Sequence, residues 1–395
     1  MTPGLAIFYG GMVRAKSTLN MMMMSFSAIG ITTILWVLYA YSLAFGEGGS
    51  FFGKLDHLGL AGTINHLTGP TGHQIPVLAF SMFQLTFAVI TVALLSGAIA
   101  DRAKFSAWLI FSGLWVTLVY APVAHAAFTS HGFIAERIGA FDFAGGTVVE
   151  INSGAAALAL ALVLGKREGF KRDPMRPHNM PLVLLGAGLL WFGWFGFNAG
   201  SALQASSLAA TAVINTQVAT AAAAMSWLLV EKRREGKATS LGIASGAVAG
   251  AVAITPACGY VTPLGALVIG LIGGAISAWA VTRKYRMGYD DSLDVVGVHG
   301  VGGFVGMIGI GLFSAKLVNA SGADGLFISG SFSQLNKQLI ASILTAAFSF
   351  IATWLIATAI SKTIGFRVDR NTELEGLDTT IHAESAYDIN NYTTR

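Results

Sequence analysis

Apolar runs of membrane-crossing length recur along this chain, with mostly short connections between them. A helix needs about 20 apolar residues to cross ~30 Å of hydrocarbon. Ten such runs follow a shorter one at the start of the chain. The expected spans are residues 1–13, 19–45, 75–100, 105–127, 143–165, 180–203, 207–230, 240–259, 262–282, 293–315 and 338–364. The pattern predicts an all-α polytopic membrane protein of eleven helices.

The scarcity of charge supports this fold class. Only 11% of the 395 residues are charged and 54% are hydrophobic, whereas soluble domains carry about 25% charged residues. The net charge of +4 does not indicate nucleic-acid binding, because the basic residues lie in short loops between spans. The single cysteine, Cys258, excludes an internal disulfide and is interpreted as a small packing residue. No spacing of Glu, His and Cys suits a metal ion.

The first run, residues 1–13, is too short to cross a membrane by itself. Arg14 follows the apolar residues, whereas a signal peptide carries its charge ahead of them. We therefore expect a truncated first span, the second half of a helix whose start precedes Met1. A late start site or a truncated gene would both produce such a sequence.

The distribution of Lys and Arg predicts the orientation in the membrane. Sixteen of the 24 basic residues lie in the loops that follow odd-numbered spans, and four lie in the other loops. Cytoplasmic loops carry the excess of Lys and Arg, so the odd loops are predicted to be cytoplasmic. We expect a transmembrane domain at residues 1–364 and a cytoplasmic C-terminal regulatory tail at residues 365–395.

Two expected spans carry an ionisable residue inside a glycine-rich apolar run. His299 lies in the tenth span, where glycine recurs at every third position from Gly297 to Gly309, and Glu150 lies in the fifth. Ionisable groups at this depth are costly and indicate a functional site. Because these spans run in opposite directions, spans 1–5 and 6–10 are predicted to form an inverted repeat with a site at its interface. Chance similarity between two glycine-rich spans is the alternative.

Several segments resemble signature sequences of one family. They are TPGLAIFYGG at residues 2–11, DFAGG at 142–146, FGFNAGS at 195–201, DVVGVHG at 294–300, and the tail from EGLD at 375–378 to Ala386-Tyr387. Together they resemble the ammonium transporter (Amt/Mep/Rh) family, of the bacterial Amt type, in order over nearly the whole chain. The resemblance implies a homotrimer with one pore per subunit and uptake of ammonium or methylammonium across the plasma membrane. We expect no cofactor and no enzymatic activity.

An ammonium pore must reject ions of similar size. Potassium has nearly the same radius as ammonium, and moving a unit charge to the bilayer centre costs ~2.5–3.5 kcal/mol on insertion scales. A dry pore therefore excludes ions whose charge cannot be removed. Ammonium can lose a proton whereas potassium cannot, so deprotonation at the pore is the expected discriminating step.

Aromatic faces and a hydroxyl are expected to recruit the cation first. Phe83 and Phe87 are four residues apart on one helix face, as are Phe197 and Ser201. Aromatic rings attract ammonium by ~0.5–2 kcal/mol each. By resemblance, Phe87 and Phe197 match the stacked gate rings and Ser201 matches the hydroxyl that accepts from ammonium. Ordinary packing is the alternative for any single ring.

The recruitment site departs from the family pattern at one position. The end of the fourth span usually supplies a Trp, but here Phe128 ends the sequence His125-Ala-Ala-Phe. Phenylalanine lacks the indole N–H and has the weaker quadrupole. We therefore hypothesise weaker capture of ammonium.

Asp142 matches the essential acid of the family. An Asp before a glycine-rich helix start is also a good N-cap, and a carboxylate held by backbone N–H groups stays ionised. We therefore expect Asp142 to act electrostatically and structurally. Asp294, at the start of the tenth span, is interpreted in the same way.

The second departure concerns the pore itself. The family usually places two histidines face to face, and His299 matches one of them, while the other position holds Glu150. Eight residues of helix after Asp142 rise ~12 Å, to near mid-membrane. Some fungal members carry an acid here. Our hypothesis is that Glu150 and His299 form a proton relay whose titration belongs to the pair, while neutral ammonia diffuses past.

The acidic tail and the basic loops bear on possible partners, and three rival functions remain. The acidic tail is either disordered by composition or, by resemblance, an ordered cap that contacts a neighbouring subunit. A PII-type nitrogen regulator is the partner that the resemblance implies at the cytoplasmic face, bordered by basic loops that membrane lipid head groups could also explain. The rivals are an ammonium sensor with little flux, an intramembrane hydrolase using Glu150 and His299, and a channel for a neutral solute.

Overall fold

A computed structural model describes residues 1–69 and 72–387. Among these residues, nine helices are long and apolar enough to cross a membrane, and two shorter ones, α1 (Thr2–Met12) and α10 (Ser240–Ile254), complete eleven. The predicted all-α polytopic membrane fold is confirmed. The remaining described elements are short, including the hairpin of β1 (Leu67–Thr68) and β2 (Ile75–Pro76).

Two long spans are each built from two α-helices joined by a π-helical turn. Residues 19–45 become α2 (Thr18–Leu35), a π-helical turn and α3 (Tyr41–Phe45). Residues 105–127 become α5 (Phe105–Trp115), a second such turn and α6 (Ala121–Phe128). Each pair forms one continuous span.

The other spans follow the expected runs with shifted ends. They are α4 (Val77–Ser96), α7 (Asn152–Leu164), α8 (Met180–Gly200), α9 (Ser207–Glu235), α11 (Pro263–Met287), α12 (Val301–Phe313) and α14 (Ser333–Thr363). Side-chain caps fix several starts, because Asn179, Ser206, Thr239 and Thr262 each accept a bond from a backbone N–H three residues later. The apolar run at residues 338–364 begins earlier as a helix, at Ser333, since polar residues extend its first turn.

Small residues let the helices approach one another closely. A Cβ added to Gly186 on α8 would lie 2.3 Å from the backbone nitrogen of Phe8 on α1. One added to Gly250 on α10 would lie 2.4 Å from the Cβ of Ala223 on α9. In lipid, such contacts replace the hydrophobic effect as the source of helix association.

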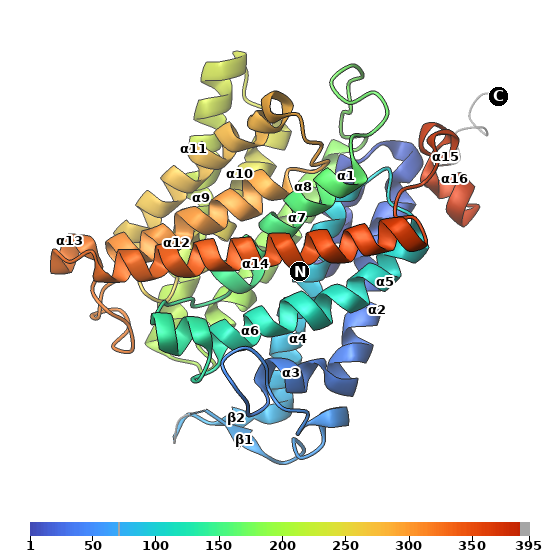
Figure 1. Ribbon diagram of the computed structural model, residues 1–395. Coiled ribbons are helices and arrows are strands. Elements are labelled where there is room, and N and C mark those ends of the chain that lie inside the picture. The colour runs from blue at the N-terminus through green and yellow to red at the C-terminus, as the bar shows by residue number, and fades with distance from the viewer. Residues whose placement is uncertain (70–71, 388–395) are drawn as a thin grey trace.

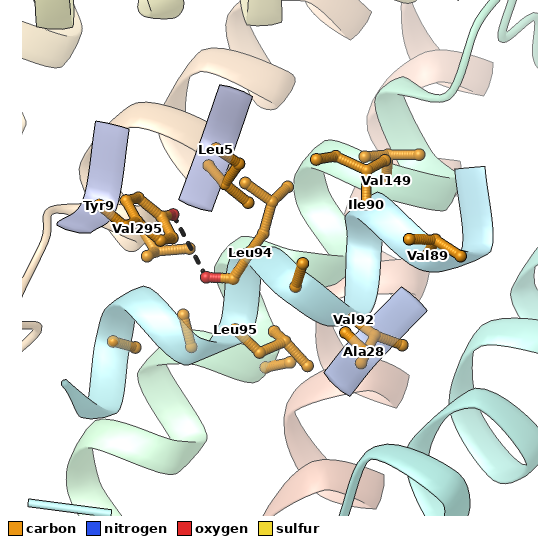
Figure 2. Close-up of a cluster of buried hydrophobic side chains, with 14 of the residues drawn as sticks. Leu5, Tyr9, Ala28, Val89, Ile90, Val92, Leu94, Leu95, Val149 and Val295 are labelled. Carbon is orange, nitrogen blue, oxygen red and sulfur yellow. Dashed lines mark hydrogen bonds between the residues drawn. The ribbon is translucent and has the colours of Figure 1, made fainter. Parts of the chain in front are cut away.

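The first helices meet in a buried cluster near the centre of the molecule. Figure 2 shows Leu5 and Tyr9 of α1 beside Leu94 of α4, with Ile90 next to Val149. The Tyr9 hydroxyl donates to the backbone oxygen of Leu94 at 3.3 Å. This bond satisfies the only polar atom of a buried ring.

The loops after the first, third, fifth and ninth spans meet at one end of the molecule, which we call the basic face. Arg14 pairs with Asp101 at 3.0 Å, and Arg167 pairs with Asp101 at 3.5 Å and with Asp290 at 2.8 Å. Although burial opposes it, the hydrogen bonds and charge of Arg167 lower the pKa of Asp290 to about 2. These ion pairs hold the odd-numbered loops together.

The tail lies on the same basic face. In Figure 1, α14 runs across the molecule from α13 (Leu326–Ser329) to α15 (Arg370–Glu375) and α16 (Leu377–His382). Asp378 accepts bonds from the backbone N–H groups of Leu19 and Asn20, at the start of α2. The described part of the tail is therefore ordered and contacts its own chain. Asp388, one of its acids, lies outside the described residues.

Candidate functional site

Glu150 and His299 each lie in a π-helical turn at the start of a span. Residues Gly146–Ile151 form the turn that leads into α7, and Val296–Gly300 form the one that leads into α12. Such turns are rare in proteins overall, but those that do occur are frequently found at functional sites. The fifth and tenth spans therefore share a local geometry as well as an ionisable residue.

The two side chains meet in the interior. Glu150 Oε2 lies 2.7 Å from His299 Nδ1, and the residues are 0% and 4% exposed. The other carboxylate oxygen, Oε1, is buried without a hydrogen-bond partner among the described residues. One oxygen of the pair is thus bonded and the other is free to accept a proton or an N–H group.

Glycine makes this approach possible. A Cβ added to Gly303 on α12 would lie 2.8 Å from the Cβ of Glu150. One added to Gly154 on α7 would lie 2.2 Å from the Cα of Gly300. A larger residue at either position would push α7 and α12 apart and separate the carboxylate from the imidazole.

Narrow cavities lie on both sides of His299. One, of about 10 Å³, is lined by Glu150, His299 and Phe197 together with apolar side chains. A second, also about 10 Å³, is lined by His299 and Asp294 among others. A volume of this size holds about one water-sized molecule. Asp294 also lines a much larger cavity, of about 590 Å³, on the basic face.

Two stacked rings close the other end of this row of cavities. The centroids of Phe87 and Phe197 are 4.0 Å apart with an interplanar angle of 16°. Phe128 and Phe83 both contact Phe87 edge-on. Their ring centroids lie 6.1 Å and 5.0 Å from that of Phe87, respectively. The hydroxyl of Ser201 donates to the backbone oxygen of Phe197 at 3.0 Å, which leaves its own lone pairs able to accept.

Comparison with known proteins decides the family. A model of the Ammonium Transporter Family matches residues 1–387. An ammonium transporter of Mycobacterium tuberculosis (strain ATCC 25618 / H37Rv) is 52% identical over 416 residues, which cover 98% of this chain and 87% of the relative. One of Bacillus subtilis (strain 168) is 50% identical over 388 residues, 98% of this chain and 95% of the relative. The chain belongs to the ammonium transporter family.

Solved structures of other proteins are similar to this chain in fold. The crystal structure of Candida albicans Mep2 superposes with a TM-score of 0.86 at 35% identity, covering 94% of this chain and 83% of that one. A structure described as a sensor Amt protein gives a TM-score of 0.86 at 27% identity, covering 95% of this chain and 93% of that one.

Asp142 organises the turn that carries Glu150. Its carboxylate accepts from the backbone N–H groups of Gly145, Gly146 and Thr147 at 2.6–2.8 Å, and from the Thr147 hydroxyl. Three backbone donors at the start of the turn are thereby satisfied by one side chain. The geometry is that of a helix cap.

Asp294 lies in a different setting from Asp142. It has a left-handed backbone with φ of +65° and pairs with Lys284 at 2.6 Å. Asp291, eight residues before His299, is the acid that accepts from the backbone N–H of the turn, at Val296 (2.8 Å). The capping role expected of Asp294 is therefore filled by Asp291. Burial raises the pKa of Asp291 to about 6, although the charge of Lys284 acts in the opposite direction.

Sequence reasoning missed Gln338 on α14. Its side-chain amide accepts from the backbone N–H of Phe141 at 2.8 Å and donates to the backbone oxygen of Phe141 at 2.7 Å. Phe141 directly precedes Asp142, so the last span fixes the approach to the Asp142 turn. A polar residue in a buried stripe of an apolar helix was the available signal.

Proposed function

We propose that this chain takes up ammonium and methylammonium by stripping a proton from the cation and conducting neutral ammonia. The observation that carries this proposal is the contact between Glu150 and His299 with a narrow cavity on either side of the imidazole. The chain's membership of the ammonium transporter family supports the substrate.

Recruitment occurs beside the stacked rings. The faces and edges of Phe87 and Phe128 surround the approach, and the lone pairs of Ser201 accept an N–H group of the cation. The fixed charge of Asp142 favours a cation nearby. Phe87 and Phe197, at 4.0 Å, leave no gap for a hydrated ion and must separate for each passage.

Deprotonation follows at the paired side chains. One N–H bond of ammonium breaks, its electron pair stays on nitrogen, and the proton passes to the Glu150–His299 pair, which releases it toward the cytoplasm before the next cation arrives. A carboxylate beside a neutral imidazole has a net charge of −1, and taking up the proton makes the pair neutral overall. The apolar cavities admit ammonia and disfavour an ion, because an unpaired charge at this depth is costly. Potassium, with no proton to give, is rejected.

The orientation and partners are part of the same proposal. The basic face carries the odd-numbered loops and the described part of the tail, and positively charged loops remain in the cytoplasm. We assign this face, with the tail at residues 365–395, to the cytoplasm and to the binding of a PII-type regulator. Three copies of the chain form a trimer with one pore in each subunit.

Pulses of different cations on a solid-supported membrane test the proposal. Ammonium and methylammonium are expected to evoke currents from proteoliposomes, and equal pulses of potassium or sodium are expected to evoke none. A potassium current of similar size would contradict selection by deprotonation. The second candidate, an ammonium sensor, is favoured by the likeness to the sensor Amt protein; binding of ammonium without current in these proteoliposomes would support it.

A further inference from the structure

Two cavities meet on the side of His299 that faces the basic face. One is the cavity of about 10 Å³ lined by His299, and the other is the cavity of about 590 Å³ on the basic face. Of the described residues, three line both cavities: Met12, Leu293 and Asp294. We call these three residues the inner neck, because they lie where the narrow passage beside His299 ends and the wide cavity begins.

The surroundings of the passage change from apolar to polar across the inner neck. Arg172 and Asp173 line the large cavity, and their side chains are 74% and 53% exposed, so this cavity is open to water. The small cavity is bordered by buried side chains such as Val248 and Val298. The inner neck is therefore the last narrow point between His299 and the water of the basic face.

The Leu293 side of the inner neck is fixed by hydrogen bonds of the backbone around it. The N–H of Leu293 donates to the backbone oxygen of Gly97 at 3.0 Å. The hydroxyl of the preceding Ser292 donates to the backbone oxygens of Ala98 and Ala100 at 3.3 and 3.2 Å. The buried Leu293 side chain is thus attached to the turn that follows α4.

The other two sides of the inner neck are also held in place. Met12 is the last residue of α1 and is buried. A Cβ added to its neighbour Gly11 would lie 2.8 Å from the backbone oxygen of Asn179, so the end of α1 packs tightly against the start of α8. Asp294 is paired with Lys284 at 2.6 Å. All three side chains therefore project from anchored backbone.

A fixed opening of this size discriminates by volume. The cavity of about 10 Å³ above it holds about one water-sized molecule. Ammonia is close to water in size, whereas methylamine carries an additional methyl group. The stacked rings of Phe87 and Phe197 separate for each passage, but the anchored inner neck does not open in this way. A methyl group is therefore opposed at the inner neck more than at the rings.

We propose that Leu293 and Met12 are specificity-determining residues, which set the size of the neutral amine that can leave toward the basic face. They favour ammonia over methylamine, and methylamine over larger primary amines. This inference rests on the proposed function, because a neutral amine has to form before it reaches the inner neck. Recruitment takes place on the other side of Glu150 and His299. The inner neck therefore affects the maximal current of each substrate more than its half-saturation constant.

Currents on a solid-supported membrane test the inference, with ammonium, methylammonium and ethylammonium pulsed over the same proteoliposomes. Leu293→Ala widens the inner neck, and we expect the ratio of methylammonium to ammonium current to rise by roughly tenfold, the lower end of the discrimination that one methylene group allows in an apolar pocket. Met12→Ala should raise this ratio too, and Leu293→Phe should lower it. Leu241→Ala is the control, because Leu241 lines the large cavity but not the small one, and it should keep the wild-type ratio.

The ratio separates a specificity role from a structural one, because damage to the fold lowers both currents together. Melting curves establish which variants are folded, and Leu293→Val, a smaller change, takes the place of Leu293→Ala if that variant does not fold. Wild-type ratios in the folded Leu293 and Met12 variants would overturn the inference, as would an equal rise in Leu241→Ala. A potassium current in the wild type would instead contradict the proposed function, and the amine ratios would still report on the inner neck.

Discussion

The carboxylate of Glu150 lies 2.7 Å from the imidazole of His299, although 149 residues separate them in the chain. Each side chain comes from a π-helical turn that begins after an acid eight residues earlier, Asp142 in one case and Asp291 in the other. The two halves of the chain therefore present matching turns to each other. Their functional residues differ, one being an acid and the other a base.

Phe128 sets the strength of cation capture in this account. Replacing it by Trp restores the larger quadrupole and an N–H donor, each absent from phenylalanine. We expect Phe128→Trp to lower the half-saturation constant for methylammonium uptake by about two- to fivefold, the equivalent of ~0.5–1 kcal/mol. Phe26→Trp, an exposed ring on α2, is the control and should leave it unchanged. An unaltered constant in Phe128→Trp would exclude a capture role for this ring.

Asp142 is expected to be needed for both stability and transport. Asn at this position keeps one acceptor oxygen, so some of the four donors at the turn lose their partner. We expect Asp142→Asn to cost about 1–2 kcal/mol of stability and to reduce ammonium currents because the fixed charge is gone. Thermal unfolding and currents measure these effects, with Asp56→Asn on the exposed outer loop as the control. Full activity of Asp142→Asn would rule out the electrostatic role.

Asp291 predicts a pH-dependent stability. Its pKa is about 6 in the folded protein and 3.8 ordinarily, so the folded state binds more protons between these values. The contribution of Asp291 to the free energy of unfolding, roughly 2–3 kcal/mol, is fully present below pH ~4. It is lost as the pH rises through ~6. We expect the melting temperature of the wild type to fall over this pH range relative to that of Asp291→Asn. Glu375→Gln, at an exposed tail position, should track the wild type. Parallel curves for wild type and Asp291→Asn would refute the assignment.

Asp378 joins the tail to the membrane domain. Asp378→Ala removes the acceptor for the N–H groups of Leu19 and Asn20, which costs about 0.5–2 kcal/mol at a helix start. We expect trypsin to cleave at Arg370 several times faster in this variant. Glu384→Ala, an exposed change in the same tail, should be cleaved at the wild-type rate. Equal rates in all three proteins would show that the tail is held by other contacts.

The sequence predicts the spans well because lipid demands continuous apolar helices. The run at residues 180–203 is an example, since it becomes α8 at Met180–Gly200. Helix ends were less predictable where polar residues extend a helix, as at Ser333 of α14. The π-helical turns at Gly146–Ile151 and Val296–Gly300 had no signal in the composition of the chain.

The site could be predicted in part. Glu150 and His299 stood out because charge is rare inside an apolar span, but their contact needed the fold. Asp294 and Asp291 are three residues apart in an acidic stretch, and only the backbone geometry shows that Asp291 caps the turn. Gln338 stood out only as a polar residue in an apolar helix, and its role could not be predicted because its partner, Phe141, is distant in the chain.

Ammonium-evoked current in Glu150 variants tests the central claim most directly. Wild type, Glu150→Ala, Glu150→His and Glu150→Gln are reconstituted at equal density after melting curves confirm that each is folded. The account predicts that Glu150→Ala reduces the current by about 100-fold or more, the scale of losing a proton-transfer group. Glu150→His, which keeps a proton carrier beside His299, should retain the current with an altered pH dependence. A wild-type current in folded Glu150→Ala would contradict the proton relay, as would failure of both Glu150→His and Glu150→Gln to restore any activity.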